Sequence, residues 1–256
     1  MVHVKNTNFP FAQDLFNSCN GNSFKNEAEA LSNFDDANII EIDSTSEVFT
    51  AYIFADNYFD MFINGVSVGK DKVPFTHLNS SIVKFKVKRP FTIAMNLVDW
   101  EEHLGIGCEA SREKMFHAGV GGMVAVIKDA RGEIIATTNK NWKAQTIYTA
   151  PIKDLSCLEE IGNYRYSKNC DDTGGNDGSN FYGLHWRTPT NCMRAEFDDS
   201  IWPNATTFTN KTIGVDDKPA YTNFTDIFDD KTHDASFIWS TNVVLNNVVL
   251  VRYTVN

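Results

Sequence analysis

The stretch that decides the fold of this chain is DNYFDMFINGVSV, residues 56–68. Phe59, Met61 and Ile63 fall on one face of an extended strand, and the residues between them fall on the other face. Asn64-Gly65 then occupies the two positions where a tight hairpin needs positive φ, and two valines resume the alternation after it. The stretch therefore predicts a β-hairpin whose turn is formed by Asn64 and Gly65.

Period-two patterning continues along most of the chain. Residues 48–54 are apolar on both faces, which is typical of a central strand, whereas 83–87 alternate apolar residues with lysines, as in a half-exposed strand. Further strands are expected over 91–97, 122–128, 133–137, 237–240 and 248–255. Residues 26–31 carry the one stretch of clear helix propensity. The pattern predicts an all-β, antiparallel jelly-roll β-sandwich with long loops and at most one or two short helices.

The chain shows neither an internal repeat nor a linker, so we expect a single domain over residues 1–256. Residues 1–37 are mixed in character and are predicted to be an irregular lead-in. Residues 99–121 break the strand pattern and are predicted to be a long loop. Residues 150–192 hold most of the cysteines and a polar run, which indicates a loop-rich insertion.

The acidic composition limits the partners of this chain. The formal net charge is −10, whereas binding to phosphate backbones or anionic membranes needs a basic face. We therefore expect neither nucleic acid nor membrane as a partner. No run approaches the roughly 18 apolar residues of a spanning helix, and the first residues lack the apolar segment of a signal peptide. The chain as it stands is expected to be soluble and cytoplasmic.

Five cysteines are present, an odd number without a C-x-x-C pair, so a thiolate zinc site is not expected. One interpretation is that all five are free thiols in a reducing compartment. The alternative is one or two disulfides, for which Cys157, Cys170 and Cys192 are the better candidates because they share a turn-rich segment. Both interpretations remain open at this point.

Three further passages, taken with the hairpin, carry a family resemblance. They are the Gly-Gly strand–turn–strand passage 121–138 with Asn141-Trp142-Lys143, the FDDSIWPNA passage 197–205, and the closing strands 237–239 and 249–252. Their order resembles that of galactose-binding-domain-like β-sandwich modules attached to glycoside hydrolases such as rhamnosidases and β-galactosidases. The resemblance covers roughly residues 45–255. It implies a sandwich fold packed around Trp142 and Trp202, and a sugar-binding role without hydrolysis.

Two clusters have the side chains that sugar binding requires. A sugar ring presents a weakly apolar face and many hydroxyls, so it needs stacking aromatics beside groups that form paired hydrogen bonds. The predicted ligand-binding residues lie where strands give way to loops, and are Trp100, Glu101, His103, Tyr182, His185, Trp186 and Arg187. The alternative is that Trp100 and Trp186 only pack these loops, whereas Trp239 is expected in the core.

No catalytic constellation stands out, so the chain is not expected to be an enzyme. The adjacent carboxylate pairs, such as Asp198-Asp199, point to opposite faces of an extended chain and cannot flank one bond. No cofactor is expected, with the exception of a structural Ca²⁺ ion. Its hard oxygen ligands would be Asp171, Asp172, Asn176 and Asp177, although their spacing does not fit an EF-hand and a solvated polar loop is the alternative.

These observations favour a non-catalytic carbohydrate-binding β-sandwich protein with ligand loops at one end of the sandwich. The second hypothesis is a structural or assembly protein, a surface or particle component, that uses the same fold without binding sugar. A third is an enzyme whose site has no recognisable motif. The sequence leaves the oligomeric state open.

Overall fold

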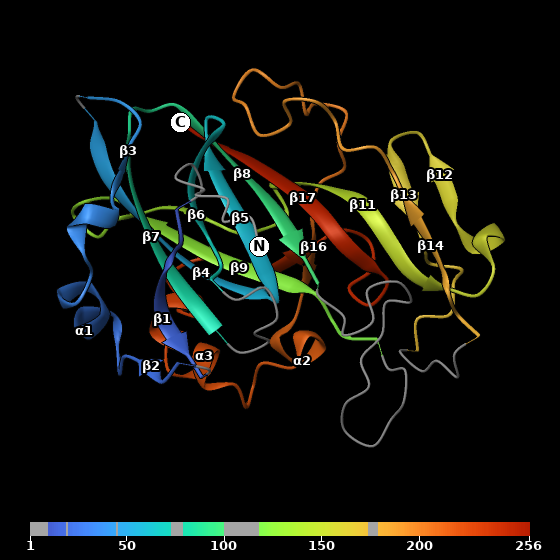
Figure 1. The fold of residues 1–256 in the computed structure, drawn as a ribbon, viewed down its shortest axis with the longest axis horizontal. Helices are drawn as coiled ribbons and strands as arrows, with labels where there is room; N and C mark the ends of the chain where they lie inside the picture. Colours follow the sequence, from blue (N-terminus) through green and yellow to red (C-terminus); the bar gives the residue numbers. More distant parts are fainter. Residues whose placement is uncertain (1–9, 19, 45, 73–78, 100–117, 174–178) are drawn as a thin grey trace, which may run out of the picture.

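The computed structural model describes residues 10–18, 20–44, 46–72, 79–99, 118–173 and 179–256. Two large, mostly antiparallel sheets lie face to face in this part of the chain (Figure 1). The first sheet has the order β15-β16-β9-β4-β7-β1-β2, with β10 paired to β9 and β3 to β7. The second has the order β14-β11-β17-β8-β5-β6. The expected all-β, antiparallel sandwich is confirmed.

The strands of the nine-stranded sheet are β1 (Gln13–Asn17), β2 (Asn22–Ser23), β3 (Ile40–Glu41), β4 (Glu47–Asp56), β7 (Asn79–Val87), β9 (Gly122–Lys128), β10 (Ile134–Thr137), β15 (Thr206–Phe208) and β16 (Phe237–Trp239). Those of the six-stranded sheet are β5 (Tyr58–Ile63), β6 (Val66–Lys70), β8 (Phe91–Val98), β11 (Lys143–Ile152), β14 (Tyr182–His185) and β17 (Asn246–Val255). A separate hairpin is formed by β12 (Glu159–Ile161) and β13 (Tyr164–Tyr166). Strand β17 lies between β8 and β11, at the centre of its sheet.

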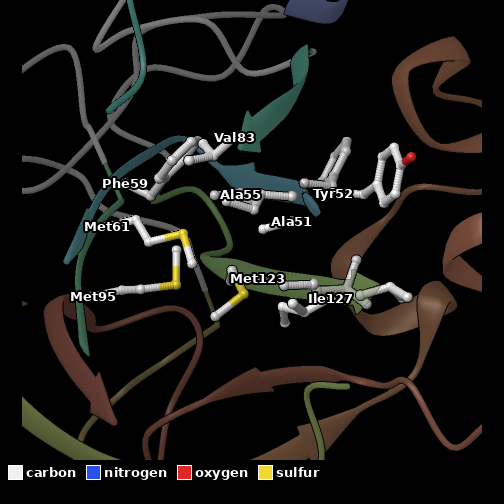
Figure 2. Packing of buried hydrophobic residues seen from close by; sticks show 14 of the residues in the cluster. Ala51, Tyr52, Ala55, Phe59, Met61, Val83, Met95, Met123 and Ile127 are labelled. Carbon is white, nitrogen blue, oxygen red and sulfur yellow. The ribbon is translucent and has the colours of Figure 1, made fainter. Parts of the chain in front are cut away.

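The core lies between the two sheets and is filled by the inward faces predicted from the alternation. Figure 2 shows Met61 and Met95, which are Cα partners on β5 and β8, opposite Met123 of the other sheet. All three are almost fully buried. Ala51 and Ala55 on β4 leave room for these long side chains, so large and small residues alternate across the interface.

The three tryptophans expected to pack the sandwich are buried, Trp142 and Trp239 in the core between the sheets and Trp202 in a separate cluster. The Trp142 indole N–H donates to the carbonyl of Thr137, and the Trp239 indole N–H donates to the carbonyl of Asn246 on the opposite sheet. Trp202 packs with Ile147 on the outward face of the six-stranded sheet. The two hydrogen bonds satisfy the one polar atom of the Trp142 indole and of the Trp239 indole.

Short helices cover the outward face of the nine-stranded sheet. They are α2 (Asn210–Ile213), α3 (Pro219–Thr222) and α4 (Thr225–Phe228), whereas α1 (Glu27–Ser32) and the 3₁₀ turns η1 (Asp36–Asn38) and η2 (Leu155–Cys157) lie elsewhere. Tyr221 of α3 packs edge-on against Phe54 of β4, which explains why β4 is apolar on both faces. The described residues thus hold more short helices than the one or two expected, because single turns are too short to show a helical period.

The hairpin at Asn64-Gly65 is confirmed. Asn64 has φ 51° and Gly65 has φ 83°, as a tight turn between β5 and β6 requires. The Asn64 side chain also accepts a hydrogen bond from the Thr92 backbone N–H at 2.8 Å. The turn is therefore tied to the neighbouring strand β8.

Two expectations about irregular segments need correction. The predicted lead-in, residues 1–37, contains β1, which pairs with β7 and buries Leu15 completely. A strand of five residues with one buried apolar anchor gives too weak an alternation to be recognised. Residues 150–192 hold β14 and the β12–β13 hairpin as well as loops. Of the long loop expected over 99–121, residues 100–117 lie outside the described part.

Gly65→Ala is predicted to destabilise the protein more than Gly132→Ala. Both glycines have φ near +83°, so both substitutions carry the strain of a left-handed conformation, about 1 kcal/mol. A Cβ at Gly65 would also lie 2.9 Å from Cγ of Arg194, whereas a Cβ at Gly132 meets nothing within 4 Å. Urea unfolding of the two variants measures the difference, and equal losses would contradict the close approach of Arg194.

Candidate functional site

After β11 ends at Ile152, the chain returns to the start of that strand at Ala205, whose backbone N–H donates to the carbonyl of Trp142. The residues between, 153–205, are called here the excursion, and their described part covers part of the six-stranded sheet. The last part of the excursion, residues 187–202, is called here the covering segment. Cys192 and Trp202 of this segment pack on Ile147 and Leu250, which lie on the outward face of the sheet. One part of that face is thereby closed off from solvent.

Arg252 anchors the covering segment. Its side chain is 2% exposed on the outward face of β17, and its Nε donates to Asp199 at 2.7 Å. The guanidinium also donates to the backbone carbonyls of Cys192, Arg194 and Phe197. A buried cation is tolerated only when its donors are satisfied in this way, so Arg252 and the packing of Cys192 and Trp202 together hold the segment on the sheet.

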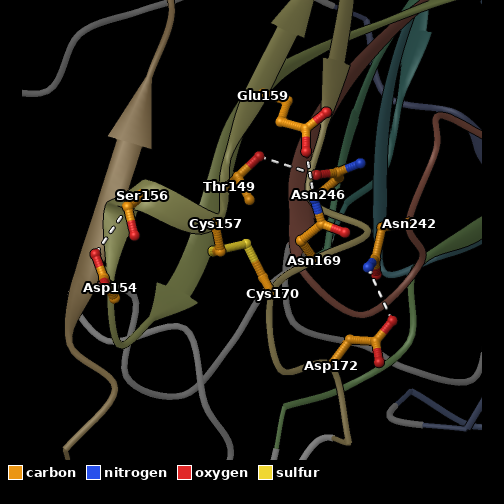
Figure 3. Close-up of a disulfide and its surroundings, with 10 residues drawn as sticks. All are labelled: Thr149, Asp154, Ser156, Cys157, Glu159, Asn169, Cys170, Asp172, Asn242 and Asn246. Carbon is orange, nitrogen blue, oxygen red and sulfur yellow. Dashed lines mark hydrogen bonds between the residues drawn. A yellow bond between two sulfur atoms is a disulfide. The ribbon is translucent and has the colours of Figure 1, made fainter.

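A disulfide joins Cys157 to Cys170, 13 residues apart (Figure 3). The interpretation of five free thiols is therefore wrong for this pair, whereas Cys192 is a buried free thiol, and Cys19 and Cys108 lie outside the described residues. Cys170 packs against Ile152 and Leu245. Closing a loop of this length stabilises a fold by about 3 kcal/mol in chain-entropy terms.

The four predicted ligand residues around β14 do not form one cluster. Tyr182 is exposed and its ring contacts Phe181, with centroids 4.6 Å apart. His185 is exposed and approaches the ring of Tyr148 at 6.3 Å. Arg187 is exposed beyond the strand. Alternation along β14 puts Tyr182 and His185 on opposite faces, so the sequence spacing alone misled the grouping.

Trp186 is half-buried and has structural contacts. Its indole N–H donates to the Glu160 carboxylate, and the Arg165 guanidinium lies 5.0 Å from the ring centroid. Arg165 also pairs with Glu160 at 3.8 Å and donates to the carbonyl of Thr146 on β11. Trp186 therefore ties β14 to the β12–β13 hairpin, and one face of its ring is covered by a cation.

The other predicted site residues are resolved in part. Asp171 accepts the Thr173 backbone N–H at 3.1 Å, which lowers the pKa of its carboxyl, and Asp172 accepts from Asn242 at 3.0 Å. Within the described ranges no group of three or more His, Cys, Asp or Glu side chains could hold a metal. The remaining predicted residues, Trp100, Glu101, His103, Asn176 and Asp177, lie outside the described residues.

A row of side chains crosses the outward face of the six-stranded sheet beside the covering segment. Strand register places its members directly opposite one another on β14, β11, β17, β8 and β5, and they are His185, Tyr148, Val248, Val98 and Tyr58. Five strands at about 4.8 Å spacing make this sheet-face row roughly 19 Å long. It has the rings of His185 and Tyr148 at the β14 end, the ring of Tyr58 at the β5 end and two valines between.

Polar side chains extend the sheet-face row at its β5 end. Asp60 and Asn96 are Cα partners, one alternation further along β5 and β8 from Tyr58 and Val98. The Tyr58 hydroxyl donates to Asp60 at 2.9 Å. Burial raises the pKa of the Asp60 carboxyl, although the Tyr58 hydrogen bond and the charge of Lys70 oppose the shift. A half-buried carboxylate with a shifted pKa is typical of functional sites.

The β14 end of the row is shaped by a glycine. A Cβ added at Gly183 would lie 2.6 Å from the Tyr148 hydroxyl oxygen, so only glycine leaves room for this ring. Tyr148 is half-buried, and burial raises the pKa of its hydroxyl. The Tyr148 ring thus lies between Gly183 and His185 on the same face, where the rings of residues 148 and 185 meet.

Sequence reasoning found His185 of this row and missed the others. Tyr58 and Asp60 were visible as the outward face of the hairpin strand, but nothing in the sequence indicates that they lie in register with residues 98, 248, 148 and 185. Bulges in β11 between Thr146 and Thr149 shift its register further. A half-polar outward face on strands otherwise buried was the available signal.

Comparison of the chain with protein families, curated proteins and solved structures gives no match. Among the described residues, no helix is long and apolar enough to cross a membrane.

Asp60→Asn is predicted to raise the melting temperature at pH 7. The folded state raises the pKa of Asp60 above its unfolded value, so wild-type stability falls as pH rises between these two values. The asparagine side chain does not ionise, so it removes this loss of stability, and its amide oxygen still accepts the hydrogen bond from the Tyr58 hydroxyl. The gain should disappear below pH 3.8, where the carboxyl is protonated in both states.

Asp129→Asn is the matched control of opposite sign. Hydrogen bonds from the backbone N–H groups of Glu133 and Arg131 lower the pKa of Asp129 despite its partial desolvation. Its contribution is present above the unfolded pKa and lost as pH falls through the folded one. This variant should lose stability at pH 7. Melting curves at pH 7 and pH 3.5 measure both variants, and a loss of stability in Asp60→Asn would contradict the assignment.

Proposed function

We propose that this protein binds carbohydrate, without hydrolysing it, on the sheet-face row. The observation that carries the proposal is the composition of that row: Tyr58 and Tyr148 supply rings, and Asp60, Asn96 and His185 supply hydrogen-bonding groups on one continuous face. Polar residues on an outward face are ordinary in an antiparallel sandwich; what favours binding here is that the rings and the hydrogen-bonding groups lie beside one another on this face.

The chemistry of the row suits a sugar chain. Val248 is half-buried between the two tyrosines and offers an apolar contact for the C–H face of a sugar, whereas Val98 beside it is buried, and the polar groups lie at the margins. One stacked ring with three or four hydrogen bonds amounts to roughly 4–6 kcal/mol, which corresponds to micromolar to millimolar affinity. A row of roughly 19 Å is long enough for several sugar units.

The charge around the row favours neutral sugars. Asp60 is its carboxylate, and the chain carries a formal net charge of −10, so an acidic sugar would be repelled. Glycoside hydrolysis commonly uses a pair of carboxylates that flank the scissile bond. Of the adjacent pairs considered from the sequence, Asp199 is engaged by Arg252 and Asp198 accepts the Ser200 backbone N–H at 3.0 Å. These contacts favour a binding role over catalysis.

A second candidate function, assembly with other molecules, is favoured by one observation. Exposed large hydrophobic side chains concentrate in the excursion, where they are Leu155, Ile161, Tyr164, Phe181, Tyr182 and Ile201. Such a concentration is typical of an interaction surface. Light scattering after size exclusion distinguishes the two: a stable oligomer that binds no sugar would favour assembly.

Asn96→Ala and His185→Ala are each predicted to weaken sugar binding about tenfold, because each removes one hydrogen-bonding group from the row. The measurement is binding to a printed panel of neutral tetrasaccharides of galactose, glucose, mannose and rhamnose, followed by titration of those that bind. An oligogalacturonide of the same length serves as the acidic counterpart and is expected to bind least.

Arg187→Ala is the matched control. Arg187 belongs to the cluster predicted from the sequence but lies beyond β14 and outside the row, so its loss should leave the affinity within about twofold. Loss of binding in Arg187→Ala with normal binding in Asn96→Ala would move the site to the loops. No binding of any panel member at millimolar concentration would refute the carbohydrate proposal.

A further inference from the structure

We propose that the Cys157–Cys170 disulfide is a redox switch for the sheet-face row. Reduction releases the β12–β13 hairpin, and release of the hairpin loosens the end of the row formed by Tyr148 and His185. The proposal rests on the proposed function for its biological meaning, and its structural steps rest on contacts between the described residues.

The disulfide is reachable by a reductant. Both cysteines line a surface pocket of about 270 Å³, together with Lys153, Asn169 and Asp171. The thiolate of a dithiol reductant attacks Sγ of Cys157, the S–S bond breaks, and Cys170 leaves as a thiolate that takes up a proton. The second thiol of the reductant then displaces Cys157, so the dithiol is oxidised to a disulfide while the protein gains two thiols.

The hairpin is the segment that the disulfide encloses. Strands β12 and β13 lie between the two cysteines in sequence, and Cys170 is fixed against Ile152 and Leu245 of the sandwich. Asn169 beside Cys170 also donates to the Glu159 carboxylate at the start of β12 (Figure 3). A two-stranded hairpin is marginally stable by itself, so after the S–S bond breaks this one depends on the packing of Cys157 and Leu158 beside Cys170 and on its hydrogen bonds to β11 and β14.

The hairpin holds the edge of β11 next to the row. Arg165 donates to the carbonyl of Thr146, and the Gln145 side chain donates to the carbonyl of Asn163 at 3.1 Å. These contacts lie at the bulge of β11 that places Tyr148 opposite Val248. When the hairpin leaves, the carbonyl of Thr146 and the amide of Gln145 both lose their partners.

The hairpin also holds the end of β14. Glu160 accepts from the Trp186 indole, and Arg165 covers its ring. Trp186 continues the pairing of β14 with β11 through its backbone N–H, which donates to Ile147 at 2.8 Å, and it directly follows His185. The β12–β13 hairpin thus contacts both β11 and β14, the strands that carry Tyr148 and His185. Its release therefore affects these two residues together.

Hydrogen exchange tests the coupling without any sugar. Dithiothreitol is added to the native protein, and mass spectrometry of alkylated protein counts the two new thiols. Exchange at residues 146–149 and 183–186 should then rise at least tenfold, whereas exchange in β5 and β8 stays unchanged. Cys157→Ser/Cys170→Ser should show the fast exchange without reductant and no further change with it.

Three outcomes would overturn the switch: a disulfide that dithiothreitol does not open in the native protein, unchanged exchange in β11 and β14 after two thiols appear, or faster exchange throughout the sandwich. Binding to the printed tetrasaccharide panel gives the functional outcome, with at least a tenfold weaker affinity expected after reduction. If neither form binds any tetrasaccharide, the carbohydrate proposal fails while the exchange result still decides the coupling.

Discussion

The outward face of the six-stranded sheet depends on how the Arg252 guanidinium is satisfied. Burying this cation without acceptors would cost several kcal/mol, and the covering segment provides them through Asp199 and three backbone carbonyls. The segment must therefore lie over the β17 end that carries Arg252. The remainder of the face, from β5 to β14, is left to the half-polar row.

That division gives the two faces of the sheet different roles under the carbohydrate-binding proposal. The inward face of this sheet is apolar, and its Met61 and Met95 pack against Met123 of the other sheet. The fold therefore does not rely on the outward face for its stability. The outward face can then keep Asp60 half-buried at some cost, since the core compensates for it. Functional groups on rigid strands are also held more precisely than groups on loops, and that precision favours the row over the loop clusters as a place for recognition.

Much of the fold could be predicted from the apolar pattern, since β5, β7, β8 and β17 show a period of two and β4 and β9 are short apolar runs typical of central strands. The candidate site could not, because register joins residues that are far apart in sequence, and the bulge in β11 decides where Tyr148 points. The contacts of Trp186 could not be predicted from the sequence either. Glu160 and Arg165 lie more than 20 residues before it, and only the fold of the β12–β13 hairpin places them beside the indole. Cysteine spacing likewise left the pairing open.

The central place of β17 has a consequence for synthesis on the ribosome. Strands β8 and β11 both pair with residues 246–255, so the sheet stays divided until those residues have emerged. At ordinary translation rates the wait after β8 is on the order of ten seconds. During that interval β8 and β11 each keep one edge without its strand partner, and such an edge is where a nascent chain is most prone to association with its neighbours.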